Sequence, residues 1–272
     1  MRIVLVLDTA FMNGGLAKVA FDSARGLKAM GHEPILFAAA GPVDERLKAA
    51  GVEVHCLDQQ ELKSDGALFQ AAWRGIHNAK AAAGLEKLLA SLPPGDTVIH
   101  VHGWAKALSS SIAEPIRKSG LPCLWTMHEY FVLCPNGGFY NYKRHEHCHL
   151  KPLSLPCLTT HCDSRTLAHK MWRSVRTGVL KHVHHLYDVM KDIACFHPYQ
   201  RAIIAPHVGP DVRLHEVANP VEVENWGPKE NPASGDFVFL ARISMEKGPF
   251  IFAEAARLAG ITVSFVCHGH DV

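Results

Sequence analysis

Two basic residues and the start of a helix converge near the C-terminal end of the sequence. An apolar run stops at Arg242, and Lys247 follows five residues later, directly before Gly248-Pro249 and a helical pattern. Helix N-termini attract anions through unpaired N–H groups and the helix dipole. Arginine and lysine add charge-assisted hydrogen bonds to phosphate. The spacing therefore predicts that Arg242 and Lys247 bind a diphosphate.

A second anion-binding candidate is the pair Gly14-Gly15, between a strand pattern at 3–7 and a helix pattern at 16–30. Backbone N–H groups there can approach a phosphate or a sugar closely. A tight turn that needs unusual backbone angles explains the pair equally well. The chain has no Gly-x-Gly-x-x-Gly and no acid at the end of the second strand pattern, 34–38, which argues against dinucleotide binding.

His128 and its neighbour Glu129 follow a strand pattern at 122–127. A histidine at a strand's carboxyl end can transfer a proton or hold a sugar hydroxyl, although most lone histidines are structural and this chain has 19. His100 and His102, at the preceding strand end, are predicted to face opposite sides, one of them toward the cleft. We predict His128 as the catalytic residue and His102 and Glu129 as cleft residues.

Four cysteines fall within 29 residues that are rich in Pro, Gly, Asn and His: Cys134, Cys148, Cys157 and Cys162. Such an insert cannot form its own core and needs a staple, which in a reducing compartment favours a metal over disulfides. Four thiolates suit structural zinc. An iron–sulfur cluster and unconnected thiols are the alternatives, because no Cys-x-x-Cys is present. The alternative ligands are His147, His149 and His161, and the cysteines predicted as buried small hydrophobes are Cys56, Cys123, Cys195 and Cys267.

Composition indicates a globular protein of one large or two smaller domains, with 272 residues of which 48% are hydrophobic. The net charge of +2 gives no reason to expect nucleic acid as a partner. The N-terminal apolar run meets Asp8 after five residues, unlike a secretory signal, and no run reaches the ~20 apolar residues of a membrane span. We therefore expect a cytoplasmic protein.

Residues 165–187 contain no acid, and Leu167, Met171, Val175 and Val179 repeat at helical spacing. A basic amphipathic helix can lie on the inner face of an anionic membrane as a peripheral contact. The favoured alternative is a helix that docks its apolar face on the core and leaves its basic face in solvent.

Strand and helix patterns alternate along the chain, which predicts an α/β fold with a doubly wound parallel sheet. The predicted domains are 1–222, including a cysteine-rich insert at 130–165, and 236–272, joined by a linker at 223–235 that is rich in Pro and Gly. The predicted strands are 3–7, 34–38, 52–56, 97–101, 122–127, 189–196, 212–217, 237–240 and 261–267. The predicted helices are 16–30, 67–92 (one helix or a pair), 105–118 and 199–207, with another beginning at Gly248-Pro249.

Taken in order, these motifs resemble glycosyltransferase family 4, the retaining enzymes of the GT-B architecture, of which a subset has a similar cysteine-rich insert. The matching pieces are Gly14-Gly15, His102-Gly103, His128-Glu129 before Cys134-Pro135, Asn219-Pro220-Val221-Glu222, and Leu240 to Gly248. The resemblance implies two Rossmann-like domains, with a nucleotide-sugar bound between them.

The resemblance also implies a reaction, the transfer of a hexosyl group with retention to a glycan or lipid-linked acceptor in polysaccharide or glycolipid synthesis. Arg242 and Lys247 would hold the donor diphosphate and stabilise the leaving group. Gly14-Gly15 would lie under the donor phosphates or near the acceptor, and His128 would face the transferred sugar. No catalytic divalent ion is expected, and the chain has no Asp-x-Asp motif.

The sequence departs from the family in one respect. The family has two glutamates, eight positions apart, well downstream of the Arg/Lys motif, and this sequence ends at Val272 before them. The sequence therefore predicts a truncated glycosyltransferase with an incomplete second domain and weak or no activity. The alternatives from other classes are a non-catalytic, metal-stapled interaction module and a redox enzyme that uses the cysteines.

Overall fold

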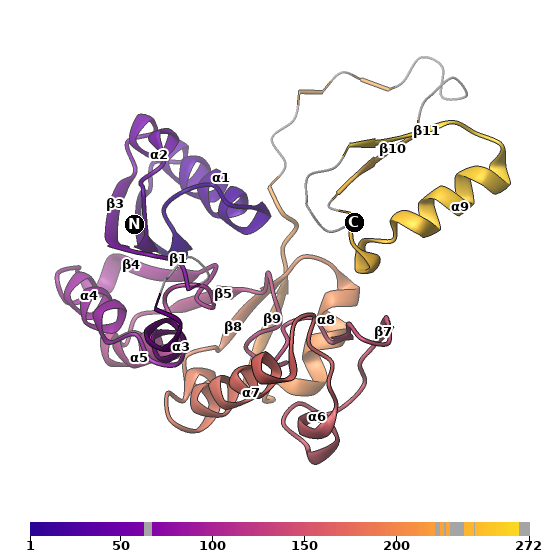
Figure 1. Ribbon diagram of the computed structural model, residues 1–272. Coiled ribbons are helices and arrows are strands. Elements are labelled where there is room, and N and C mark those ends of the chain that lie inside the picture. The colour runs from indigo at the N-terminus through magenta and orange to yellow at the C-terminus, as the bar shows by residue number, and fades with distance from the viewer. Residues whose placement is uncertain (63–66, 221–223, 226, 229–236, 242, 267–272) are drawn as a thin grey trace.

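The computed structural model describes residues 1–62, 67–220, 224–225, 227–228, 237–241 and 243–266 (Figure 1). Its main feature is a seven-stranded sheet of order β3-β2-β1-β4-β5-β8-β9, in which all neighbouring strands are parallel. The strands are β1 (Arg2–Thr9), β2 (Glu33–Ala40), β3 (Glu53–Gln59), β4 (Thr97–Val101), β5 (Cys123–Thr126), β8 (Asp192–Cys195) and β9 (Arg213–Glu216). The predicted α/β class and parallel sheet are confirmed.

Strand β1 is apolar throughout its middle because both faces of the sheet are covered, as is usual for parallel sheets. Val4 and Val6 belong to one hydrophobic cluster, and Leu5 and Leu7 belong to a second one. Helices α1 (Gly15–Ala29) and α2 (Glu45–Ala49) cover the face with Leu5, whereas α4 (Ala79–Ala90) and α5 (Ala113–Ser119) cover the face with Val4 (Figure 1). The alternation with a period of two thus fills two separate cores.

One helix prediction is confirmed and one needs correction. The predicted helix or pair at 67–92 is a pair, α3 (Leu68–Ile76) and α4, because Asn78 caps α4 by accepting a hydrogen bond from Ala81 N. The predicted helix 105–118 is wrong in its first half. Ala107 and Leu108 there donate their backbone N–H groups to the buried carboxylate of Asp8, so a turn forms and α5 begins only at Ala113.

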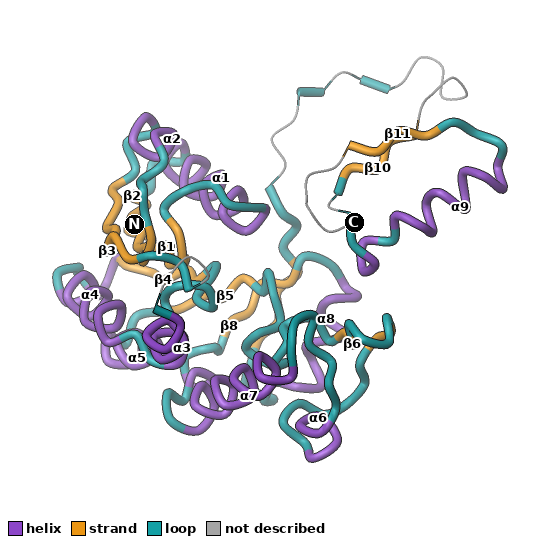
Figure 2. The backbone as a smooth tube through the Cα atoms, viewed as in Figure 1, coloured by secondary structure: helices purple, strands orange, loops and turns teal. Residues whose placement is uncertain are grey.

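The insert at 130–165 contains little regular structure apart from the short antiparallel pair β6 (Tyr140–Asn141) and β7 (Glu146–His147) and the helix α6 (Leu155–Thr159), as Figure 2 shows. Asn136 holds its turns together. Its Nδ2 donates to Tyr140 O (2.7 Å) and its Oδ1 accepts from Gly138 N (3.0 Å). The insert is therefore ordered by polar contacts rather than by a core of its own.

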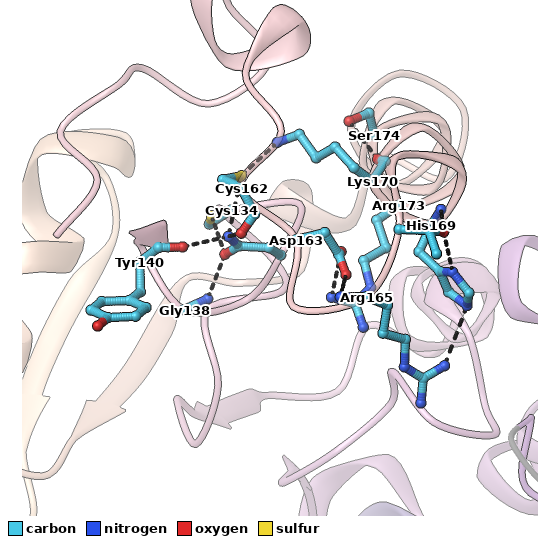
Figure 3. A network of polar contacts seen from close by, with 12 residues as sticks. Cys134, Gly138, Tyr140, Cys162, Asp163, Arg165, His169, Lys170, Arg173 and Ser174 are labelled. Atoms are coloured by element: carbon cyan, nitrogen blue, oxygen red, sulfur yellow. Dashed lines mark hydrogen bonds and ion pairs between the residues drawn. The ribbon is translucent and has the colours of Figure 1, made fainter. Parts of the chain in front are cut away.

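The predicted metal staple is not supported. Across the described ranges, no group of three or more His, Cys, Asp or Glu side chains is arranged to hold a metal ion. Instead, the Lys170 side chain enters the cysteine cluster, and its Nζ lies 3.3 Å from Cys162 Sγ and 3.5 Å from Cys157 Sγ (Figure 3). The Lys170 amine thus lies against two of the sulfurs that were predicted to bind zinc.

Helix α7 (Leu167–His182) is oriented opposite to the favoured prediction. Lys170 and Arg176 are buried, whereas Met171 and Val175 are about half exposed, at 47% and 54%. Lys170 and Arg176 each have specific partners inside the protein. These contacts stabilise this orientation of the helix more than burial of its apolar face would stabilise the opposite one. The predicted packing of that apolar face on the core is therefore wrong.

Beyond the sheet, β10 (Phe237–Leu240) and β11 (Val263–Val266) form a parallel pair connected through α9 (Pro249–Ala259). Phe239, Phe252 and Phe265 pack with ring centroids 5.5 Å apart. Most of the predicted linker 223–235, and also Asp236 and Cys267, lie outside the described residues. The remaining helix, α8 (Pro198–Ile204), agrees with the prediction. None of the helices in the described ranges combines the length and apolar character that a membrane span requires.

Candidate functional site

A narrow crevice lies where strands β4 and β5 end, beside the start of α1. The strand order reverses between β1 and β4, and in open parallel sheets ligands bind beyond the carboxyl ends of the strands at such a reversal. The crevice holds a volume of about 20 Å³, enough for one water molecule. Its lining residues include Leu16, His102, Gly103, Trp104, Met127, His128, Glu129 and Phe131.

Three histidines meet at this crevice. His100 Nε2 lies 2.7 Å from Thr126 Oγ1, and His102 Nδ1 lies 3.2 Å from His128 Nε2. The rings of His100 and His102 are 4.0 Å apart between centroids, so the prediction that they face opposite sides is wrong. Side chains two positions apart along a strand share a face.

The three rings are neutral at neutral pH. Burial lowers the pKa of His100 to about 4, and burial, His100 and Lys106 lower the pKa of His128 to about 4. Burial, with both neighbouring histidines, holds the pKa of His102 well below its usual value. A neutral imidazole offers one donor and one acceptor, so the tautomers decide what His128 presents to a ligand.

The hydrogen bonding favours one pair of tautomers. His102 Nε2 is buried and has no hydrogen-bond partner among the described residues. An unpaired buried acceptor is tolerated better than an unpaired buried N–H. We therefore assign the proton of His102 to Nδ1, which donates to His128 Nε2. His128 then carries its own proton on Nδ1, and it acts as a hydrogen-bond donor rather than as a base.

Asp8, at the end of β1, positions one wall of the crevice. Its Oδ1 accepts hydrogen bonds from Ala107 N (2.7 Å) and Leu108 N (3.0 Å), which fixes the loop after β4. Burial raises the pKa of Asp8, against the effect of these backbone donors. Sequence analysis missed this role, although an acid directly after the first strand was the available signal.

Arg176 lies behind the same wall. Its Nη1 donates to Ala105 O (2.9 Å), and its guanidinium lies 4.9 to 5.5 Å from the ring centroids of Trp104, Phe131 and Trp172. Cation–π contacts of this kind stabilise a buried guanidinium. Burial, followed by Arg173, lowers the pKa of Arg176 to about 10, so it remains charged at neutral pH. No pattern in the sequence distinguished this arginine from the other basic residues of the segment 165–187.

Gly14-Gly15 forms the start of α1 close to the crevice. Gly14 has a φ of +152°, and a Cβ at either glycine would meet nothing within 4 Å. The pair is therefore open to a ligand, and no side chain caps the first turn of α1. Glu129, the other predicted cleft residue, lines the crevice and pairs with Lys106 at 3.5 Å.

The predicted diphosphate cations are only partly described. Lys247 is exposed at the end of a 3₁₀ turn, before Gly248 (φ +77°) and the start of α9. Arg242 lies outside the described residues. Within the described part of the chain, no contact joins Lys247 to the histidines or to Gly14-Gly15. Of the four cysteines, Cys134, Cys157 and Cys162 are buried and Cys148 is half-buried.

Comparisons with known proteins place the chain in a family. Residues 14–220 match the model of the glycosyl transferase 4-like domain, so the chain belongs to this family. No curated protein sequence matches it.

Several solved structures are similar to this chain. One is a glycosyltransferase from Rickettsia africae ESF-5, with a TM-score of 0.51 and 14% identity over 97% of this chain and 59% of that one. The lipopolysaccharide outer core galactosyltransferase WaaB in its apo form (TM-score 0.48, 13% identity, 98% and 60% coverage) and Acinetobacter baumannii MurG (0.47, 13%, 97% and 59%) are also similar. The chain thus spans about 60% of the length of these structures.

The neutral histidines predict a loss of stability in acid. Because the folded-state pKa of His100 is about 4 and its unfolded value is 6.5, the unfolded state binds more protons between these limits. The free energy of unfolding should be constant above pH 6.5 and should fall below it, by roughly 2 kcal/mol per histidine at pH 5. Urea unfolding at pH 7.5 and pH 5 measures this. His100→Gln should weaken the pH dependence of the free energy of unfolding. An unchanged pH dependence would contradict the assignment of His100 as a neutral, buried histidine.

The role of Asp8 is tested by substitution. Asp8→Ala leaves two buried N–H groups without an acceptor and should lower the free energy of unfolding by about 3 kcal/mol. Asp8→Asn keeps one acceptor oxygen and should cost about 1 kcal/mol. Asp96→Ala, at an exposed carboxylate, is the control and should cost less than about 0.5 kcal/mol in the same urea titration. Equal losses for Asp8→Ala and Asp96→Ala would exclude the capping role.

Proposed function

We propose that the protein is a retaining glycosyltransferase that transfers a hexosyl group from a nucleotide-sugar to a glycan or lipid-linked acceptor. The observation that carries the proposal is His128, which lies neutral and hydrogen-bonded at the end of β5, within the region that matches the family. In this proposal residues 1–222 form the acceptor-side domain, and residues from 236 onward belong to the donor-binding domain.

Each proposed role follows from the chemistry of its residue. His128 Nδ1–H donates a hydrogen bond to a hydroxyl of the transferred sugar, because its Nε2 is engaged by His102. Gly14-Gly15 brings the unpaired N–H groups of α1 close to a phosphate or to the acceptor. Arg242 and Lys247 neutralise the charge that develops on the departing diphosphate. These cations replace a catalytic divalent ion in the proposed mechanism.

A lipid-linked acceptor requires access to a membrane, and the surface of α3 and α7 suits one. The two helices are in contact through Trp172, whose Nε1 donates to Ala72 O at 3.0 Å. Phe69 and Trp73 on α3 are 88% and 65% exposed. Exposed Arg165 lies two residues before α7, and exposed Lys181 lies in its last turn. Exposed apolar side chains together with exposed cations on two packed helices suit the interface of an anionic bilayer.

The catalytic proposal predicts that His128→Ala lowers kcat about 100-fold, as expected for the loss of a hydrogen bond that stabilises the transition state. Turnover is measured as release of nucleoside diphosphate from a panel of nucleotide-sugars with candidate acceptors, and proton NMR of the product reports the anomeric configuration. His182→Ala, at an exposed histidine, is the matched control and should retain activity. An inverted product would refute the retaining mechanism.

Donor binding is measured separately by calorimetric titration with nucleoside diphosphates. Lys247→Ala and Arg242→Ala should each weaken binding about tenfold, because each removes a charge-assisted bond to phosphate. If the wild-type chain neither binds nucleoside diphosphates nor turns over any donor, the interaction module is the better description.

The membrane contact predicts that the Phe69→Ser/Trp73→Ser variant loses binding to vesicles that contain phosphatidylglycerol, by about tenfold in partition coefficient. Its free energy of unfolding should change by less than about 1 kcal/mol, because both side chains are exposed. Met30→Ser, at an exposed residue directly after α1, is the control. Vesicle binding that is equal in all three proteins would rule out this surface, and concentration-dependent dimers would indicate a second copy as the occupant.

A further inference from the structure

The Lys170 side chain is enclosed by the cysteine-rich insert. It has no exposed surface, and Cys134, Cys157 and Cys162 around it are at most 5% exposed. Its Nζ donates to Cys162 Sγ (3.3 Å) and Cys157 Sγ (3.5 Å), as Figure 3 shows for Cys162. The proposed transferase activity does not use this cluster.

The amine has weak partners for a buried lysine. Thiol sulfur is a poor hydrogen-bond acceptor, and a buried charge is costly unless it is paired. The carboxylate nearest to it in sequence, Asp163, is engaged by Arg173 Nη1 at 2.8 Å. Among the described residues, no carboxylate lies within ion-pair distance of Lys170. The Lys170 amine therefore lies against sulfur, and a covalent N–S bond would replace the buried charge with a neutral group.

We propose that Lys170 and Cys162 become joined by a sulfenamide bond when the protein meets hydrogen peroxide. Peroxide oxidises the Cys162 thiol to a sulfenic acid. In this step the O–O bond breaks, an S–O bond forms and one water leaves. The Lys170 ammonium loses one proton to solvent and its nitrogen lone pair attacks sulfur, the S–O bond breaks, and the hydroxyl leaves as water with a second proton from the nitrogen. One thiol, one ammonium and one peroxide give one N–S bond, two waters and one proton, a two-electron oxidation of sulfur.

Cys162 is favoured over Cys157 because it is closer and because its position is fixed on both sides. Asn136 Nδ2 donates to Cys162 Sγ (3.3 Å) and to Cys162 O (3.2 Å). The next residue, Asp163, is buried and anchored to α7 through Arg173. A sulfur held in this way has little freedom to reach another thiol, whereas the amine already touches it.

The bond would fasten the insert to α7, and through α7 to the crevice. Lys170 lies six residues before Arg176, which holds Ala105 O and packs against Trp104 and Phe131. The crosslink thus supplies under oxidation the staple that the insert's composition predicted, without a metal. The modification is reversible, since thiols reduce an N–S bond.

The experiment is peptide mapping of the reduced chain after treatment with stoichiometric hydrogen peroxide and alkylation of the remaining thiols. We expect a tryptic peptide pair joined through Lys170 and Cys162, lighter by two hydrogens than the separate peptides, without cleavage after Lys170. Dithiothreitol should abolish it. The Tm of the oxidised chain should exceed that of the reduced chain.

Matched variants test the assignment. Lys170→Arg keeps the cation, and Cys162→Ser removes the sulfur, so both should lose the linked peptide completely. Cys195→Ser removes a buried thiol on β8 and should retain it. Circular dichroism checks that each variant folds, and mapping of the wild-type chain is decisive even if one does not.

Three results would overturn the proposal. The first is a Cys157–Cys162 disulfide with Lys170 still cleaved by trypsin. The second is sulfinic acid on Cys162 with no linked peptide. The third is stoichiometric zinc in the purified protein that protects the thiols from peroxide.

Discussion

Helix α7 turns three cations toward the protein interior, and each of them holds a different part of the chain. Lys170 reaches the sulfurs of Cys157 and Cys162, Arg173 pairs with buried Asp163, and Arg176 holds the loop after β4. These contacts fix the insert and one wall of the crevice to a single helix. A buried cation requires such partners, because desolvation is otherwise too costly, so the helix has one stable orientation.

In the crevice, by contrast, the buried histidine side chains are uncharged. His100, His102 and His128 are buried next to one another and stay neutral. Burial disfavours a charged imidazole, and a positive charge on one ring disfavours protonation of its neighbours. The nearby charges, Arg176 and the Lys106–Glu129 pair, come from separate loops and a helix. A neutral hydrogen-bond donor suits a sugar hydroxyl, and in the proposed transferase the strong charges remain at the diphosphate.

Much of the fold was predictable. The strands of the large sheet were found within a few residues. The clearest, β1 and β2, are apolar runs that a parallel sheet buries on both faces. The motif order also led to the family. The errors at α7 and at residues 105–118 share a cause. Periodicity assigned side chains to faces by polarity, but the groups that decide the outcome lie outside each helical pattern. Asp8 is 99 residues from Ala107, and Ala105 is 71 residues from Arg176. The partners of Lys170 and Arg173 lie in the insert before α7.

The amino-acid sequence by itself determined the parallel α/β sheet, the family, and the positions of Gly14-Gly15 and His128 after their strands. Alternating strand and helix patterns, and the motifs at the strand ends, are enough to predict these features. Only the tertiary structure decided that the Lys170 side chain enters the cysteine cluster, that the apolar side of α7 faces outward, and that His128 Nε2 is hydrogen-bonded to His102. The physical reason is that desolvation and pairing depend on which distant groups meet, and no local spacing records that.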